Sequence, residues 1–216
     1  MGRATPAGRR PQRPAPSRGS LGPEAIVAAA RELVAEAGLE AVSMRLLAER
    51  LRCTPRALYR HVASKDELLE LLADAVLADV PEARPGRPWQ EELAAFFVAM
   101  RAHLVAEPSL TRLVAERTVS GPHFRRHFDR LATLLLDAGF DDATAVDLVL
   151  AMAYYTIGAS LPGTGDAIQA RYAAGWDAAL DESVPALRRV APALAHGPAE
   201  ARFRTALDRM LAAYAR

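Results

Sequence analysis

The chain has 216 residues, enough for one large domain or two small ones. Its 51% hydrophobic and 25% charged residues are typical of a globular protein and exclude a wholly disordered or collagen-like chain. The formal net charge of +1 conceals an asymmetry, because residues 1–62 carry 11 Arg and 5 Glu, a net charge of +6, and the rest carries a net charge of −5. This basic N-terminal third predicts a polyanionic partner.

The sequence favours a cytoplasmic protein with no membrane segment. The single cysteine, Cys53, cannot form an intrachain disulfide, which favours a reducing compartment. The first 20 residues contain five Arg and four Pro and lack the apolar run of a signal peptide. The longest apolar stretch, 148–161, is shorter than the roughly 20 residues that span a bilayer.

The first 80 residues predict a basic arm followed by four helices. Residues 1–21 are rich in Arg and Pro without periodic apolar residues, so we expect a disordered arm. Apolar residues at helical spacing predict a first helix from Pro23 to the stop at Gly38. Three hydroxyl residues in N-cap contexts then predict two short helices and a longer one that runs to Val80; these caps are Ser43, Thr54 and Ser64.

A second, larger helical body is predicted beyond the Pro-rich and Gly-rich segment 81–88. Its expected helices span 89–107, 110–117, 122–138, 142–161, about 166–180, and 199–214. No alternation of apolar and polar residues predicts a strand. The predicted fold class is therefore all-α, with an N-terminal helix-turn-helix DNA-binding domain over 22–80, including the connecting helix, and a helical effector-binding and dimerisation domain over 81–216.

The short third helix of the first body is a candidate DNA-reading element. Two short helices between two longer ones suit the presentation of one helix to a DNA groove. The positions of this segment that face away from the core carry long hydrogen-bond donors and a ring: Arg56, Tyr59, Arg60 and His61. Spacing and composition alone fit an ordinary solvated basic helix equally well.

The stretch Gly38 to Leu72, above all LYRHVASKDELL at 58–69, resembles the DNA-binding head of the TetR family of bacterial transcriptional regulators. The resemblance implies contacts with DNA from Met44, Arg45, Thr54, Pro55, Arg56, Ala57, Tyr59, Arg60, His61 and Lys65. Arg52 departs from the pattern, because such heads usually have glycine in this turn. A positive φ there would cost about 1 kcal/mol.

The second body resembles the C-terminal domain of the tetracycline repressor subgroup. The resemblance rests on Gly139 to Leu161 and on ALDRMLAAY at 206–214. It implies a homodimer through the 142–161 and 199–214 helices, which binds a double-stranded operator of palindromic half-sites. The alternative is that the apolar helix over 148–161 is the central core helix of a monomer.

The resemblance further implies that the second body binds a small organic effector. The candidate effector-binding residues are Phe96, Met100, His103, Leu104, Leu113, Arg117, Phe128, Leu131, Leu135, Tyr155 and Trp176. Taken singly, each aromatic residue is more often core than ligand contact. The histidine pattern with which tetracycline repressors hold a magnesium–drug chelate is absent from this sequence, so tetracycline is not the expected ligand.

We therefore predict a repressor that a small organic effector releases from DNA. Enzyme motifs such as HExxH, GxGxxG and GxSxG are absent, so neither catalysis nor a cofactor is expected. One alternative is a metal-responsive regulator that uses His123 and His127, which share a helical face beside unfavourable arginines. Another is a helical interaction module without sequence-specific DNA binding.

Overall fold

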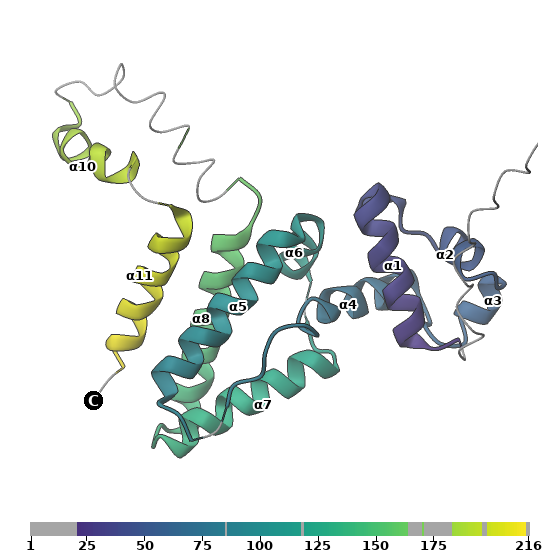
Figure 1. Ribbon diagram of the computed structural model, residues 1–216, viewed down its shortest axis with the longest axis horizontal. Helices are drawn as coiled ribbons and strands as arrows, with labels where there is room; N and C mark the ends of the chain where they lie inside the picture. Colours follow the sequence, from purple (N-terminus) through teal and green to yellow (C-terminus); the bar gives the residue numbers. More distant parts are fainter. Residues whose placement is uncertain are drawn as a thin grey trace, which may run out of the picture.

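The computed structural model describes residues 21–84, 86–117, 119–163, 170, 183–195 and 198–214. All regular secondary structure within these ranges is helical, which confirms the all-α prediction. Figure 1 shows α1, α2 and α3 at one end of an elongated molecule, the body at the other, and α4 between them. The predicted arm, apart from Leu21, and the helix expected near 166–180, apart from Ala170, lie outside the described residues.

The head is built from short helices with local start signals. Its elements are α1 (Pro23–Ala37), the 3₁₀ turn η1 (Leu39–Ala41), α2 (Met44–Arg50), α3 (Pro55–Leu58) and α4 (Lys65–Ala75). The predicted caps are present, because the hydroxyls of Ser43, Thr54 and Ser64 each accept a hydrogen bond from the backbone N–H three residues later. Gly38 ends α1 with φ of 83°, a conformation that favours glycine.

Helix α4 ends at Ala75, five residues before the predicted end at Val80. Beyond Ala75 the backbone changes to hydrogen bonds between residues three apart, from Leu77 N–H to the Asp74 carbonyl and from Val80 N–H to the Leu77 carbonyl. No glycine or proline marks this change, because the first breaker in the sequence is Pro81. The predicted end of this helix at Val80 was wrong, because the change to hydrogen bonds between residues three apart leaves no local signal in the sequence.

The body contains the longer helices. They are α5 (Trp89–Ala106), α6 (Pro108–Glu116), α7 (Pro122–Asp137), α8 (Asp142–Ser160), α10 (Pro185–Ala195) and α11 (Ala199–Ala212). Helix α8 begins at residue 142, as predicted, and its N-cap is Asp141, whose carboxylate accepts the Thr144 N–H at 2.9 Å. No helix was predicted over 185–195, because prolines usually interrupt helices, whereas here Pro185 begins α10 and Pro192 lies inside it.

One apolar core continues from the head into the body through α4. Helix α4 packs against α1 on the head side and against α6 and α7 on the body side. Its fully buried Leu68 and Leu72 join the side chains of both parts in one cluster. Burial of such a leucine contributes about 1.5–3 kcal/mol, so α4 is a packed element and not a flexible linker.

Helix α8 is apolar around most of its circumference, as predicted. By length and composition alone it is apolar enough to cross a membrane, a test that core helices of soluble proteins also pass. It packs against α5, α6 and α7, with α11 beyond α5 (Figure 1). Only 33% of its most apolar window is buried within the chain, and Tyr154 is 68% exposed. A large part of an apolar helix is thus left uncovered by the described chain.

Candidate functional site

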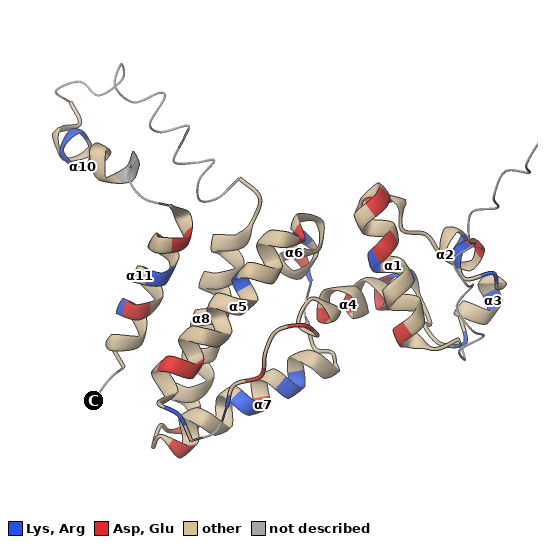
Figure 2. Ribbon diagram, in the orientation of Figure 1, with Lys and Arg blue, Asp and Glu red and all other residues tan. Residues whose placement is uncertain are grey.

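The outer face of the head is basic, and the local fold explains why. Leu58 and Val62 point into the core, with exposed fractions of 0% and 1%. Burial of these two side chains turns Arg56, Tyr59 and Arg60 outward, and Tyr59 is 49% exposed. Figure 2 shows basic residues gathered around α2 and α3 at this end of the molecule. Such a convex surface of guanidinium groups and a phenol suits phosphates and base edges.

Seven of the ten predicted DNA contacts are exposed in the structure. They are Arg45, Thr54, Pro55, Arg56, Tyr59, Arg60 and Lys65. Ala57 and His61 are half-buried, and Met44 is buried with an exposed fraction of 7%. The Met44 side chain belongs to the core cluster, so its place in the head is that of a packing residue at the start of α2.

The backbone of Arg52 adopts a left-handed conformation. Its φ is +52°, which makes it the one residue other than glycine with positive φ in the described part of the chain. The backbone reaches this angle while the N–H groups of Arg52 and Cys53 bond to the carbonyls of Glu49 and Ala48. The turn is therefore shaped as glycine would shape it, with an exposed arginine beside the α3 surface.

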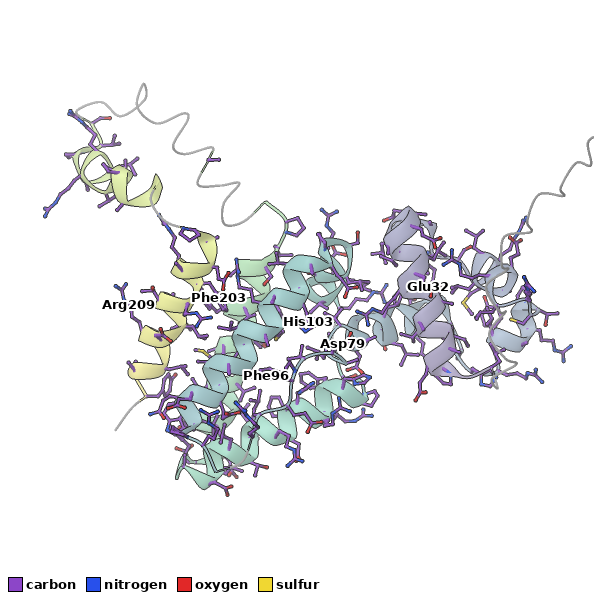
Figure 3. All side chains as sticks on the ribbon, viewed as in Figure 1. Glu32, Asp79, Phe96, His103, Phe203 and Arg209 are labelled. Carbon is purple, nitrogen blue, oxygen red and sulfur yellow. The ribbon has the colours of Figure 1, made fainter. Side chains whose placement is uncertain are left out.

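Ion pairs join the helices of the head to one another and join α1 to the body. The Arg50 guanidinium forms ion pairs with two carboxylates of α1. It lies 3.3 Å from the Glu32 carboxylate and also contacts the Glu36 carboxylate. Arg31 of α1 reaches across to Asp79 at 3.1 Å and to Glu107 at 2.5 Å. Figure 3 labels Glu32 on the head and Asp79 in the turns after α4. These arginines are therefore engaged in holding the head in place.

A cavity of about 630 Å³ lies between α4, α5, α6, α7 and α8. It is lined by Ala73, Leu77, Phe96, Phe97, Met100, Val114, Ala115, Glu116, Arg117, Val119, Phe124, His127, Phe128, Leu131, Val149, Leu150, Ala153, Tyr154, Ile157 and Gly158. Most of these side chains are apolar, and the rings of Phe124 and Phe128 lie 5.6 Å apart. The volume and the apolar wall suit a small organic molecule of several rings.

Five of the eleven predicted effector residues line this cavity: Phe96, Met100, Arg117, Phe128 and Leu131. Three others, Leu104, Leu113 and Leu135, are almost fully buried in the core. His103, on α5 (Figure 3), and Tyr155 are not among the lining residues either, and Trp176 lies outside the described residues.

Tyr155 takes part in a different cluster. Its ring stacks on Phe203 of α11 with centroids 5.2 Å apart, and the Arg101 guanidinium lies 5.1 Å from the centroid of the same Phe203 ring. Figure 3 labels Phe203 on α11 beside α5. Burial raises the pKa of the Tyr155 phenol. This cluster joins α11 to α5 and α8.

Sequence reasoning missed Asp74, which joins α4 to the start of α7. Its buried carboxylate accepts the backbone N–H groups of His123 at 3.0 Å and Phe124 at 2.8 Å. These are two of the N–H groups that a helix start leaves without partners. The available signal was an acidic residue inside the apolar run 68–80, a placement that requires a partner.

His127 makes a second bond between α7 and the end of α4. Its Nε2 lies 2.9 Å from the Leu77 carbonyl oxygen, and the side chain is 2% exposed. Because a carbonyl only accepts, Nε2 carries the proton and donates. Burial lowers the pKa of His127 below its ordinary 6.5, so the ring is neutral at pH 7 and Nδ1 holds a lone pair.

Arg117 completes the connection at the other end of α4. It lines the cavity, and its Nη2 lies 2.9 Å from the Asp66 carboxylate in the first turn of α4. Asp66 follows Lys65, the predicted phosphate contact. Because both partners are accessible to solvent, this ion pair contributes only about 0–1 kcal/mol to stability.

The two histidines of the metal-responsive alternative have separate partners. His123 Nδ1 lies 3.2 Å from a guanidinium nitrogen of Arg126, while His127 binds Leu77. Within the described ranges, no three His, Cys, Asp or Glu side chains are grouped as a metal site requires. The geometry thus gives this alternative no support.

Two family models match most of the chain. Residues 26–72 match bacterial regulatory proteins of the tetR family, and residues 80–214 match the tetracyclin repressor-like C-terminal domain. The chain belongs to the TetR family. The first match ends at residue 72, within α4, and the second begins at residue 80, in the turns that follow this helix. The resemblance seen in the sequence is therefore confirmed for both bodies.

Curated relatives include other members of the TetR family. An HTH-type transcriptional regulator of Saccharopolyspora erythraea is 33% identical over 150 residues, 69% of this chain and 64% of that protein. The class A tetracycline repressor from transposon 1721 in Escherichia coli is 33% identical over 146 residues, 65% of this chain and 66% of the repressor. The chain thus spans slightly less than two thirds of the length of these relatives.

Solved structures of the family share the arrangement over nearly their whole length. ActR from Streptomyces coelicolor without ligand has a TM-score of 0.78 and 29% identity, over 91% of this chain and 96% of ActR. ActR with actinorhodin bound has a TM-score of 0.77 and 28% identity, over 90% of this chain and 97% of ActR. A TetR variant from Acinetobacter baumannii with minocycline bound has a TM-score of 0.66 and 26% identity, over 90% of this chain and 97% of that variant.

Proposed function

We propose that this chain is a homodimeric DNA-binding transcriptional repressor that a small organic effector releases from its operator. The observation that carries the proposal is the position of α4 (Figure 1), which packs against α1 of the head and ends in the cavity wall. A molecule that moves the cavity wall must therefore also act on the helix that supports the head. The ligand-bound relatives and the tetracycline repressors support a small-molecule effector.

Three contacts couple cavity and head. Arg117 binds Asp66 at the start of α4, Asp74 binds the start of α7, and His127 binds Leu77 just beyond the end of α4. An effector that favours a conformer with different contacts weakens DNA binding by the ratio of its affinities for the two conformers. Typical coupling free energies of about 1–3 kcal/mol correspond to roughly 5–150-fold in operator affinity.

The exposed side of α8 supports the homodimer. Val146 is 39% exposed and Tyr154 is 68% exposed on a helix whose most apolar window is only one third buried. A second copy that covers this face buries apolar area that the described chain leaves in water. Two heads related by a two-fold axis then read two half-sites one helical turn apart or a multiple of it.

The test is a mobility-shift assay with the DNA that flanks the gene, together with selection of bound fragments from genomic DNA. We expect a two-fold symmetric site. Replacement of Lys65 or Tyr59 by Ala is expected to weaken binding to all sequences by about tenfold, whereas Arg56→Ala alters sequence preference. Glu24→Ala, at an exposed position at the start of α1, is the matched control and leaves binding unchanged. No shift with any fragment at low salt favours the interaction-module alternative.

A further inference from the structure

Arg31 of α1 binds two carboxylates that lie outside the DNA-reading helices. Its Nη1 lies 3.1 Å from an Asp79 oxygen, and its Nη2 lies 2.5 Å from a Glu107 oxygen. Within the described part of the chain, neither carboxylate forms an ion pair with any other cation. Hydrogen bonds between ionised groups are about twice as strong as neutral ones, so the shared guanidinium defines one position of α1 against both carboxylates.

The two carboxylates come from different elements. Asp79 lies in the turns after α4 (Figure 3), whereas Glu107 lies at the corner where the chain bends by 115° between α5 and α6. The buried Thr111 hydroxyl of α6 donates to the Leu104 carbonyl of α5 and lies 3.1 Å from the Glu107 carbonyl, so the corner is fixed to both helices. The far end of α6, over 114–116, lines the cavity. The ion pair with Glu107 therefore joins α1 to a helix of the cavity wall.

Helix α1 is the base on which the DNA-reading helices are mounted. It packs against α2, which packs against α3, and Arg50 of α2 binds the Glu32 and Glu36 carboxylates of α1. On another side α1 packs against α4. Apolar packing is non-directional, so it holds α1 on α4 but fixes the angle between them less sharply than two hydrogen-bonded ion pairs do. A rotation of α1 on α4 carries α3 with it.

Loss of the Arg31 charge removes more than two hydrogen bonds. Asp79 and Glu107 both lie within 3.1 Å of this one guanidinium, so without it two negative charges face each other. Like charges at such a separation repel. The repulsion acts between the turns after α4 and the corner of α5 and α6, the two parts that Arg31 otherwise holds against α1.

We propose that Arg31 is a positioning residue for operator binding, which holds the head at the angle that DNA requires by bridging Asp79 and Glu107. This inference rests on the proposed function. It adds a connection that runs through α1, whereas the three contacts between cavity and head described above run through α4. Through Glu107, a displacement of α6 reaches α1 directly.

The angle of the head can be measured without DNA. In full-length Cys53→Ser protein, spin labels are attached at Ala28→Cys of α1 and Asp129→Cys of α7, two exposed positions. Pulsed electron paramagnetic resonance then gives the distance between head and body, and dilution with unlabelled protein restricts it to labels within one chain. We expect Arg31→Gln to broaden the distance distribution and to weaken binding to the selected operator about fivefold, at the lower end of typical coupling.

Arg50→Gln is the matched control that separates positioning from stability. The side chains of Arg31 and Arg50 are each 27% exposed and each binds two carboxylates, but both partners of Arg50 lie on α1. The two substitutions should therefore lower the free energy of unfolding by similar amounts, whereas Arg50→Gln should keep the distance distribution of the wild type. Glu107→Ala removes no helix cap and should broaden the distribution, with no further broadening when it is combined with Arg31→Gln.

Several results would overturn the proposal. They are a distance distribution unchanged by Arg31→Gln or by Glu107→Ala, equal broadening in Arg50→Gln, and full operator affinity of Arg31→Gln. The distances are measured without DNA or effector, so they decide the role of Arg31 in holding the head even if the proposed function fails. Failure of the proposed function would instead appear as the absence of a shift of the wild type with every DNA fragment.

Discussion

Arg52 shows how a single residue can be strained by the turn that it occupies. The turn between α2 and α3 places it at φ +52°, where a side chain with a Cβ costs about 1–2 kcal/mol and glycine costs little. The surrounding hydrogen bonds of the turn hold the angle in place. The exposed side chain follows α2 and precedes the proposed DNA surface of α3, where a phosphate contact in the complex would offset the strain.

Replacement of Arg52 by Gly should raise the free energy of unfolding by about 0.5–1 kcal/mol, because the relief of strain exceeds the entropy that glycine adds to the unfolded chain. Urea denaturation followed by circular dichroism measures the difference. Arg60→Gly is the matched control, since Arg60 has no positive φ, and it should be neutral or destabilising. A less stable Arg52→Gly protein would show that the turn does not strain the arginine.

At the scale of elements, the junction of α4 with α7 is closely packed around one carboxylate. A Cβ on Gly121 would fall well inside van der Waals contact of the Asp74 side chain. Gly121 therefore allows the start of α7 to approach α4 closely enough for Asp74 to cap it. The position requires glycine for space, since its φ is −72°.

Gly121→Ala should lower the free energy of unfolding by about 1–3 kcal/mol, because it displaces a buried carboxylate from its two N–H donors. A double-mutant cycle with Asp74→Ala, measured by urea denaturation, identifies the cause. If the clash with Asp74 is responsible, Gly121→Ala costs little in the Asp74→Ala background. Equal costs in both backgrounds would contradict this explanation.

His127 makes the same junction sensitive to pH. Burial, assisted by the charge of Arg126, lowers its pKa below 6.5 in the folded state despite the hydrogen bond to Leu77. The unfolded chain therefore binds a proton first, and stability that is complete above pH 6.5 is lost as the pH falls toward the lowered pKa. The free energy of unfolding should fall more steeply from pH 7 to 5 in wild type than in His127→Gln, with His123→Gln as the control. Parallel pH profiles for all three proteins would refute this.

At the scale of the whole molecule, charge and apolar surface are segregated. Residues 1–62, which include the outer face of the head, carry the positive net charge. The remainder of the chain, which includes the body, carries the negative net charge. A DNA duplex attracts the first and repels the second, which orients the protein before any specific contact forms. The apolar side of α8 lies in the body, away from the basic end (Figure 2).

Val146→Arg should dissociate the proposed dimer, because it places a charge on the apolar stripe of α8 that the exposed Val146 forms with the half-buried Leu150, Ala153 and Ile157. Sedimentation equilibrium should show a monomer, and operator affinity should fall at least tenfold as the second half-site contact is lost. Leu136→Arg, at an exposed position of α7, is the matched control and should remain dimeric. A dimeric Val146→Arg protein would place the interface elsewhere.

The sequence by itself determined the features with local causes. The caps Ser43, Thr54 and Ser64 start their helices with hydrogen bonds over three residues, and periodic apolar positions place Phe96, Met100 and Phe128 on inward faces. Such signals need only neighbours in the chain, so the helix count of the head and its family resemblance were readable in advance.

Only the tertiary structure decided how α4 ends and which inward residues face the cavity. Leu104, Leu113 and Leu135 share the apolar pattern of the cavity residues but pack into the core, because helical periodicity gives a face and not the neighbour opposite it. The roles of Asp74 and His127 depend on partners about 50 residues away. Contacts over that separation exist only once α4 and α7 are packed together, so no local pattern encodes them.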